Sequence, residues 1–398
     1  MEILVLAAGS HGDVVPFTGL GARLRQAGHT VTVATQPRFE ELVTASGLEF
    51  RALPGELRRD LAPLKQATEF VRELGRGVVA AAGSGADLLL LTATTAPLGW
   101  QLAEAAGIPS VGAYLQPVHP TAEFVPVVGS GRSLGRWGNR AAGRLSLQLV
   151  DRVYGDTVRR LRAELGLPAV GRGVVRKRLE ATGWPVLYGY SPSVLARPAD
   201  WRAGLEVVGN WWPDDPADAR LPAGLTDFLQ AGPPPVFIGF GSMGGGEGER
   251  LGELAVRALR LAGVRGVLQS GWAGLTGSGD DLYRIEELPH ALLFRHVAAV
   301  VHHGGAGTTA AALRAGVPAV PVPVLGDQPF WARTLHRLGA GTEPVPFKEL
   351  TAERLAAAIT RTVREPGYRA RAAALAARLA GEDGAGRSVE LIERWAAG

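Results

Sequence analysis

The chain repeats one local pattern in its two halves: a short apolar run, a glycine-rich turn and a stretch with helical spacing. The first copy runs from Glu2 through the turn at residues 9–13, and the second runs from Val236 through the turn at Gly239–Met243. Continuous apolar runs are typical of parallel strands that are buried on both faces. Strands that alternate with helices build a doubly wound sheet. The sequence therefore predicts an α/β protein with two Rossmann-like parallel-sheet domains.

A segment rich in proline, aspartate and tryptophan separates the two halves, and we interpret it as a linker. With 398 residues the chain is long enough for two or three domains. We expect an N-terminal domain over residues 1–208, a linker over 209–222 and a C-terminal domain over 223–380. The last segment, 381–398, has helical spacing, and we expect this helix to pack back on the N-terminal domain.

Composition excludes several classes of protein. The formal net charge is +4 and the basic residues are scattered, so no nucleic-acid partner is expected. There is no cysteine, which excludes disulfides and thiolate metal sites. The longest apolar stretches are shorter than the ~20 residues of a membrane-spanning helix. The first residues contain Glu2 and no basic segment, so they indicate a strand rather than a signal peptide. We expect a cytoplasmic location.

Histidines and glycines gather at the carboxyl end of a predicted strand near residue 302, where parallel sheets bind ligands. Glycines allow a ligand to approach the backbone closely. A helix that begins near Thr308 would point free N–H groups at a phosphate, and His303 could donate to the same group. The turn at Gly241-Ser242 offers a second hydroxyl. Each turn could instead only pack a helix on a strand, with Ser242 as a helix cap.

Two further polar pairs lie at predicted strand ends. Asp327-Gln328 could bind sugar hydroxyls, or Asp327 could be an N-cap with a proline just inside the helix. Asp13 follows the first strand, where a helix dipole favours its ionised form. An ionised carboxylate can accept the proton of an attacking hydroxyl, although an N-cap role would also explain Asp13. His11 could be a second base, a hydrogen-bonding partner or a bystander.

Together these segments resemble the family 1 glycosyltransferases of the GT-B fold, over essentially the whole chain. The resemblance is strongest to the sterol 3-beta-glucosyltransferase-like group and to the vancomycin-type antibiotic glycosyltransferases. It rests on residues 9–31, 188–201 and 236–243, and on the long stretch "HHGGAGTTAAALRAGVPAVPVPVLGDQPFWARTLHRLGAG" at 302–341. This last stretch is a form of the donor-sugar signature of the family.

The resemblance implies a role for each of these positions. The diphosphate of a nucleotide sugar would contact the histidine, the glycines and the hydroxyls of the two turns, namely His303, Gly305, Gly307, Thr308, Gly241 and Ser242. Asp327 and Gln328 would hold the sugar hydroxyls. Trp272 and Ile285 would flank the base. In the sterol and vancomycin-like groups a Gly-Asp step supplies the general base, and the matching step here is Gly12-Asp13.

The implied reaction is direct displacement with inversion, from UDP-glucose as the usual donor of the group, without a metal and without a cofactor beyond the donor substrate. Asp13 would take the proton of the acceptor hydroxyl. His11 stands where the sterol group has arginine, so the sequence leaves open whether it shares this role. A dTDP-deoxysugar donor is an alternative, as are a nucleotide-sugar 2-epimerase on the same fold and a carbohydrate-binding relative without activity.

The acceptor is the least constrained part. The segment from Pro117 to Glu180 has the character of a cover over an acceptor. Apolar residues of the N-terminal half suit a sterol, a flavonoid or a polyketide, although each could equally be core: Phe17, Leu115, Phe124 and Trp137. We expect a transient membrane contact only if the acceptor is a lipid, and a monomer or a weak homodimer.

Overall fold

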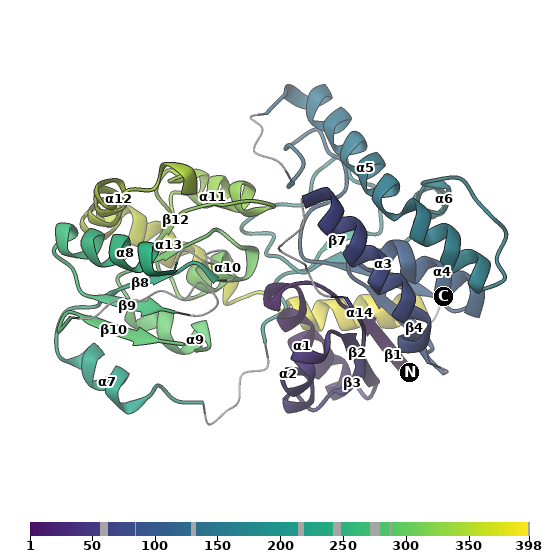
Figure 1. The fold of residues 1–398 in the computed structure, drawn as a ribbon, viewed down its shortest axis with the longest axis horizontal. Coiled ribbons are helices and arrows are strands. Elements are labelled where there is room, and N and C mark those ends of the chain that lie inside the picture. Colours follow the sequence, from purple (N-terminus) through teal and green to yellow (C-terminus); the bar gives the residue numbers. More distant parts are fainter. Residues whose placement is uncertain are drawn as a thin grey trace.

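Two parallel sheets form the framework of the computed structural model (Figure 1). The structure describes residues 1–55, 63–83, 85–128, 133–213, 219–241, 248–270, 279–286 and 288–396. The sheet of the first half has the strand order β3-β2-β1-β4-β5-β6-β7. Its strands are β1 (Glu2–Leu6), β2 (Thr30–Thr35), β3 (Glu49–Ala52), β4 (Leu88–Leu91), β5 (Ser110–Tyr114), β6 (Val186–Tyr188) and β7 (Leu205–Val207). The parallel α/β class predicted from the sequence is confirmed.

The helices of the first half cover this sheet. They are α1 (His11–Gln26), η1 (Pro37–Phe39), α2 (Glu40–Ala45), α3 (Pro63–Ala82), α4 (Ala96–Ala106), α5 (Gly135–Glu164) and α6 (Val174–Ala181). The segment that we interpreted as an acceptor cover therefore contains the long helix α5, which packs on α3 and α4. Figure 1 shows the N-terminal end of α5 rising beyond the other helices of this domain.

The sheet of the second half has the order β10-β9-β8-β11-β12. Its strands are β8 (Val236–Gly239), β9 (Gly266–Gln269), β10 (Leu282–Ile285), β11 (Ala299–His302) and β12 (Ala319–Pro321). Its helices are α7 (Ala223–Gln230), α8 (Gly248–Ala262), α9 (His290–Leu293), η4 (Phe294–His296), α10 (Ala306–Arg314), α11 (Gln328–Arg337), η5 (Phe347–Glu349), α12 (Ala352–Arg364) and α13 (Pro366–Leu379).

Burial on both faces explains why the strands are continuous apolar runs. Along β1, Leu4 and Leu6 enter one core cluster, whereas Ile3 and Val5 enter another on the opposite face of the sheet. This alternation follows from the period of two in a strand. Phe237 in β8 likewise faces away from the cluster that contains its two neighbours. A polar side chain at the centre of β1 or β8 would therefore lie in apolar surroundings, which explains why these two central strands are apolar beyond Glu2.

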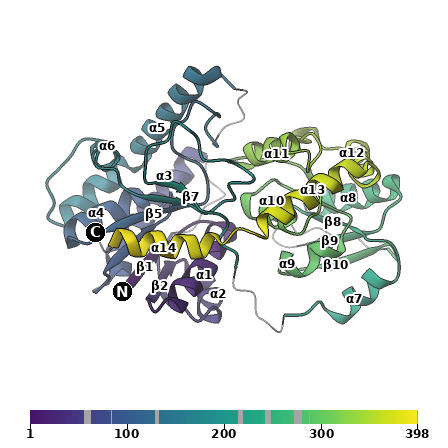
Figure 2. The same cartoon turned by 180° about the vertical axis from the view of Figure 1, so that it is seen from behind.

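The last helix, α14 (Gly384–Ala396), packs on α1 of the first domain. Figures 1 and 2 show it lying along that domain, with both chain ends on the same side of the molecule. Val389 and Ile392 join the core cluster of Ile3 and Val5. The buried indole of Trp211 donates through Nε1 to Ser388 Oγ over 2.8 Å. The chain thus passes from the first half to the second and then returns.

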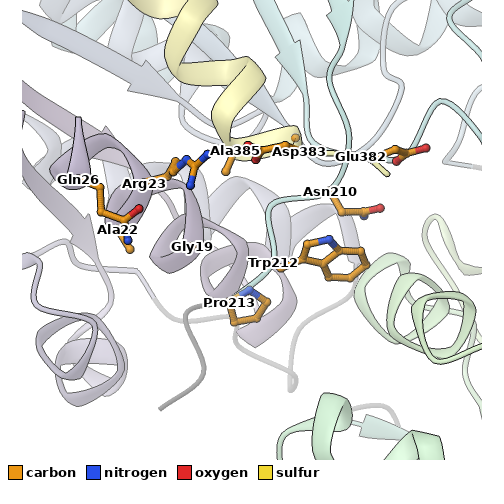
Figure 3. A pocket seen from close by; sticks show the side chains of 11 residues that line it. Gly19, Ala22, Arg23, Gln26, Asn210, Trp212, Pro213, Glu382, Asp383 and Ala385 are labelled. Carbon is orange, nitrogen blue, oxygen red and sulfur yellow. Dashed lines mark hydrogen bonds and ion pairs between the residues drawn. The ribbon is translucent and has the colours of Figure 1, made fainter. Parts of the chain in front are cut away.

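A hollow of ≈ 210 Å³ marks the place where the two crossing segments meet α1 (Figure 3). Polar side chains line it, including Arg23, Asn210, Glu382 and Asp383. Arg23 and Asp383 form an ion pair of 2.7 Å, which joins α1 to the segment before α14. None of the side chains assigned to a site from the sequence lines this hollow, so it belongs to the hinge region rather than to the candidate site.

The return of α14 generates a stability prediction. Ile392 is fully buried, so Ile392→Ala should lower the free energy of unfolding by about 2–4 kcal/mol, because it removes apolar contacts and leaves a cavity. The exposed neighbour Glu390 on the same helix provides the matched control, and Glu390→Ala should change the melting temperature by little. Thermal unfolding of the two variants checks this. Equal melting temperatures would mean that α14 adds nothing to the first domain.

Candidate active site

Asp13 lies in the first turn of α1, directly after β1. The helix begins at His11 with Ser10 as its N-cap, so Asp13 occupies the third helical position and is not itself the N-cap. Its Oδ2 accepts hydrogen bonds from the backbone N–H and the Oγ of Ser10, both at 2.8 Å. A carboxylate at this position is favoured by the helix dipole. Asp13 is thus the second member of the capping box that Ser10 begins, and it lies close to the carboxyl end of β1, a central strand.

Gly9 fixes the position of this carboxylate. Its φ of +148° is in the region that favours glycine, and a Cβ on Gly9 would lie 2.5 Å from Asp13 Oδ2. The carbonyl of Gly9 accepts a hydrogen bond of 2.7 Å from Arg38. A larger residue at position 9 would therefore displace Asp13, which is a physical reason for glycine at the start of the turn.

His303 lies between the two glycine-rich turns of the second domain. A Cβ on Gly241 would come within 3.0 Å of its Cε1, and a Cβ on Gly305 would come within 2.5 Å of its Nε2. Its Nδ1 is buried and has no hydrogen-bond partner in the described part of the chain. Burial lowers the pKa of His303 to about 4, so the ring is neutral at pH 7. An unpartnered imidazole beside bare backbone is suited to an incoming anion.

The helix that follows His303 adds free N–H groups. α10 begins at Ala306 with Gly305 as its N-cap, two residues earlier than the sequence pattern predicts. The N–H of Thr309 is the first to bond within the helix, to the carbonyl of Gly305, so the N–H groups of Ala306, Gly307 and Thr308 are free for a ligand. Gly307 is exposed and faces open space. This end of α10 therefore has the chemistry of a phosphate site.

Asp327 is the N-cap of α11, yet its side chain does not cap the helix. Instead its Oδ2 accepts a hydrogen bond of 3.0 Å from Nε1 of Trp331, one turn further on. Gln328 is buried, and its Oε1 accepts from the backbone N–H groups of Val324 and Leu325 at 2.9 and 3.1 Å. The indole of Trp331 thus fixes the carboxylate of Asp327. The side chain of Gln328 fixes the loop that leads into α11.

Aromatic side chains of the first domain pack against α11. The ring of Tyr190 lies 5.8 Å from that of Trp331, and the ring of Phe124 lies 5.4 Å from that of Phe330. The two α11 rings also contact each other in a T-shaped pair at 5.3 Å. Trp331 is 2% exposed, so its indole has little freedom. The packing of Tyr190 from the first domain on α11 therefore helps to set the position of the Trp331 indole, which donates to Asp327.

The two carboxylates face each other across the domain junction. Burial raises the pKa of Asp327, and the negative charge of Asp13 raises it further. Burial also raises the pKa of Asp13, while hydrogen bonds from Ser10 lower it in part. The side chain of Gln116, two residues after β5, lies close enough to both carboxylates to lower the pKa of each. Carboxylates with raised pKa values that converge from two domains are typical of catalytic sites.

His11 is exposed at the start of α1 and lies near a histidine of the other domain. Burial lowers the pKa of His290 to about 4, and positive charge on His11 and on His303 lowers it further. The His290 ring stacks on Phe294 at 4.4 Å between centroids. His290 therefore lies close to His11 of the first domain and to His303 of the second.

The remaining predicted residues lie elsewhere or outside the described ranges. Ser242 and Trp272 fall outside the described residues. Ile285 ends β10, and its side chain lies in the core cluster with Phe237. Phe17 is fully buried against Trp211, so the acceptor role that we considered for it is wrong. Leu115 is partly buried against the core, whereas Trp137 is 89% exposed.

Sequence reasoning missed three residues at this junction: Gln116, His290 and Trp331. Gln116 follows a predicted strand, so its position at a strand end was the signal that could have found it. His290 follows a proline within an apolar stretch, and Trp331 has the spacing of a buried helix face. Neither the position of His290 nor the spacing of Trp331 distinguishes a side chain that faces a ligand from one that is buried in the core.

No described helix is both long and apolar enough to cross a membrane. Within the same described ranges, no group of three histidine, aspartate or glutamate side chains is placed to hold a metal ion.

Two sequence families match separate parts of this framework. Residues 3–111 match the glycosyltransferase family 28 N-terminal domain, and residues 274–389 match the C-terminal domain of erythromycin biosynthesis protein CIII-like proteins. The match to the first domain includes Asp13, and the match to the second includes His303 and Asp327. Together they describe a two-domain glycosyltransferase.

Similar proteins agree with this class. The chain is 37% identical over 423 residues to O-mycaminosyltylonolide 6-deoxyallosyltransferase of Streptomyces fradiae, covering 100% of this chain and 98% of that protein. It is 32% identical over 419 residues to a sterol 3-beta-glucosyltransferase of Arabidopsis thaliana, covering 98% of this chain but 65% of that longer protein. The solved structure of glycosyltransferase VinC in complex with dTDP, 20% identical, covers 100% of both chains with a TM-score of 0.69. The chain belongs to the family 1 glycosyltransferases with the GT-B fold.

The neutral state of His303 generates a prediction about pH. An imidazole with a pKa of about 4 must gain a proton to pair fully with a diphosphate, so a bound diphosphate should raise its pKa. The affinity for a nucleotide sugar should then rise as the pH falls from 8 to 5, because the protonated form becomes populated in the complex. Calorimetric titrations over this range measure the effect.

The matched control is His303→Gln, which keeps a hydrogen-bond donor but does not titrate. Burial raises the pKa of both carboxylates, so the informative quantity is the difference between the native protein and the variant. Parallel pH curves for the two proteins would show that His303 does not contact the diphosphate.

Proposed function

We propose that the protein transfers a hexose from a nucleoside diphosphate sugar to a hydroxyl of an apolar small molecule, with inversion at the anomeric carbon. The observation that carries the proposal is the convergence of Asp13 from one domain with Asp327 and the start of α10 from the other. In the proposal, Asp13 as the base lies opposite a combined sugar and phosphate site. The names of the similar proteins support transfer rather than 2-epimerisation.

In this proposal Asp13 is the general base. Its Oδ2 is held by Ser10, which fixes the carboxylate against the helix start. The acceptor hydroxyl gives its proton to the carboxylate while its oxygen attacks the anomeric carbon. The bond from that carbon to the diphosphate breaks on the opposite face, so an α-linked donor gives a β-linked product. Burial raises the pKa of Asp13, which makes it a stronger base than an ordinary aspartate.

The second domain stabilises the leaving group. The negative charge that develops on the departing diphosphate would meet the free N–H groups of Ala306, Gly307 and Thr308 and the imidazole of His303. Donors that are already fixed in place stabilise this charge without reorganisation in the reaction. Asp327 and Gln328 would hold the sugar hydroxyls, and His290 and Gln116 lie close enough to take part in the same site.

Two donors fit this site. UDP-glucose is supported by the resemblance to sterol 3-beta-glucosyltransferases, and Asp327 would then bind a sugar hydroxyl. A dTDP-6-deoxyhexose is supported by the 6-deoxyallosyltransferase, which matches this chain along its whole length, and by the dTDP complex of VinC. Both donors carry a diphosphate, so the sites around His303 and α10 serve either one.

A mass-spectrometric screen tests the proposal. The full chain would be mixed with UDP-glucose or with a dTDP-6-deoxyhexose, and with a pool of sterols, flavonoids and polyketide alcohols. A product heavier by one sugar residue identifies the donor and the acceptor class in one step. Release of nucleotide with no sugar transferred to any acceptor, or conversion of the donor into its 2-epimer, would contradict the transferase.

The base assignment predicts the effect of Asp13→Asn. Asparagine can still accept a hydrogen bond from Ser10 but cannot take the acceptor proton, so turnover should fall by about 10²–10⁴-fold. Donor affinity and melting temperature should change little. Steady-state kinetics and donor titration separate these effects. The parallel variant His11→Asn tests the neighbouring histidine, and a loss in this variant that equals the loss in Asp13→Asn would assign the base role to both residues or to His11.

The contact between Trp331 and Asp327 predicts a defect that is selective for the sugar. Trp331→Phe keeps an aromatic ring against Tyr190 but removes the N–H that Asp327 accepts. Loss of a hydrogen bond to a charged group should weaken nucleotide-sugar binding about tenfold or more, while the free nucleoside diphosphate binds as before. Phe330→Leu, which alters the packing and leaves the N–H in place, is the matched control. Equal weakening of both ligands by Trp331→Phe would show only a packing role.

A further inference from the structure

Apolar side chains form an exposed stripe along the first half of α5. Trp137 is 89% exposed, and Leu134, Leu145 and Leu149 are 65%, 55% and 50% exposed. With the exposed Ala141 they recur every three or four residues, which puts them on one face of the helix. We call this face, Leu134 to Leu149, the outer stripe of α5. A single exposed leucine needs no explanation, but an aligned set that includes a tryptophan marks an interaction surface.

The opposite face of the same helix is already packed. Asn139 is buried, donates to the carbonyl of Ala122 over 3.2 Å and accepts from the N–H of Leu134 over 2.9 Å. Gly143 lies so close to Pro120 that a Cβ on it would come within 2.9 Å. The first half of α5 is therefore held in place by its inner face. The orientation of the outer stripe follows from these contacts, and Figures 1 and 2 show this end projecting from the body of the domain.

Positive charge surrounds the outer stripe. Arg144 lies beside this stripe and Arg152 continues its line one turn further on, and both are exposed without an acidic partner among the described residues. The nearby Asp151 forms an ion pair of 2.6 Å with Arg176, so it does not neutralise these arginines. Arg140 is the exception, because it pairs with Asp200. An apolar face flanked by unpaired guanidinium groups has the composition of helices that lie in a membrane interface.

We propose that the outer stripe of α5 docks the protein on an anionic lipid surface, with Trp137 and the leucines in the headgroup region and with Arg144 and Arg152 on lipid phosphates. A second copy of the chain fits less well, because an isologous contact through this stripe would bring like charges together. This inference goes beyond the proposed function, since docking requires neither donor nor catalysis. It would bring an apolar acceptor dissolved in the lipid close to the junction of the domains.

Vesicle sedimentation with the full chain tests the inference. The probes are vesicles of phosphatidylcholine alone and of phosphatidylcholine with phosphatidylglycerol, without any donor or acceptor. The protein should sediment with the anionic vesicles, and 0.5 M salt should release it because the attraction is screened. Each of Arg144→Gln and Arg152→Gln should weaken binding about fivefold, and Trp137→Ala about tenfold.

The matched control is Leu261→Ala, which removes an equally exposed leucine from α8 in the other domain and should bind as the native chain does. All of these positions are exposed, so the substitutions should leave the melting temperature unchanged. A lowered melting temperature would therefore reveal a variant that does not fold properly. Absence of binding, or equal binding to neutral vesicles, would overturn the inference.

Two further outcomes would also overturn it and assign the surface differently. A self-association that light scattering detects in the native chain and not in Trp137→Ala would make the stripe an interface between copies. Slower turnover of a water-soluble acceptor by Trp137→Ala, with no vesicles present and no change in vesicle binding, would make the stripe a wall of the acceptor site. Because vesicle binding is measured without catalysis, failure here leaves the transferase proposal standing.

Discussion

Parallel pairing of the strands decides where every functional side chain of this protein lies. Parallel strands point their carboxyl ends to one edge, and the helix that follows each strand begins at that edge with free N–H groups. β1 delivers Asp13 to the start of α1, and β11 delivers His303 to the start of α10. The two sheets place these edges at the same junction, where Asp13 raises the pKa of Asp327. The proposed base and the proposed anion site then face each other although no single segment of the sequence contains both.

The environment of the junction gives the same side chains their chemistry. Burial shifts the two carboxylates and the histidines toward their neutral forms, so His303 and His290 are uncharged near pH 7 and the aspartates are better bases than in water. Local hydrogen bonds from Ser10 and from Trp331 oppose this shift for the carboxylates and fix their orientation. Hydrogen-bond donors in fixed positions, rather than an excess of charged side chains, therefore set the electrostatics of the site. Such donors suit a reaction in which negative charge develops on a leaving diphosphate.

Sequence patterns predicted the architecture and the strand ends at which the candidate residues lie, because both depend on local rules. Buried strands must be apolar, and glycine is needed where Gly9 or Gly241 adopts a positive φ. The patterns failed where tertiary contacts decide the outcome. Asp13 was considered as an N-cap, whereas the N-cap is Ser10, three residues earlier, and Asp13 lies in the first turn of the helix. The short, partly polar β10 has no clear strand signal. The role of Trp331 depends on Tyr190, which lies more than a hundred residues away, so no local pattern could reveal it.

The return of α14 has a consequence for any attempt to observe the two domains moving. Both ends of the chain lie on the N-terminal domain, as Figure 1 shows, and the polypeptide crosses the hinge once in each direction. A pair of fluorophores attached to the two termini would keep a constant separation however far the domains opened, and a force applied to the termini would load one domain alone. Probes of opening belong instead on opposite sides of the junction, for example on α5 and α12.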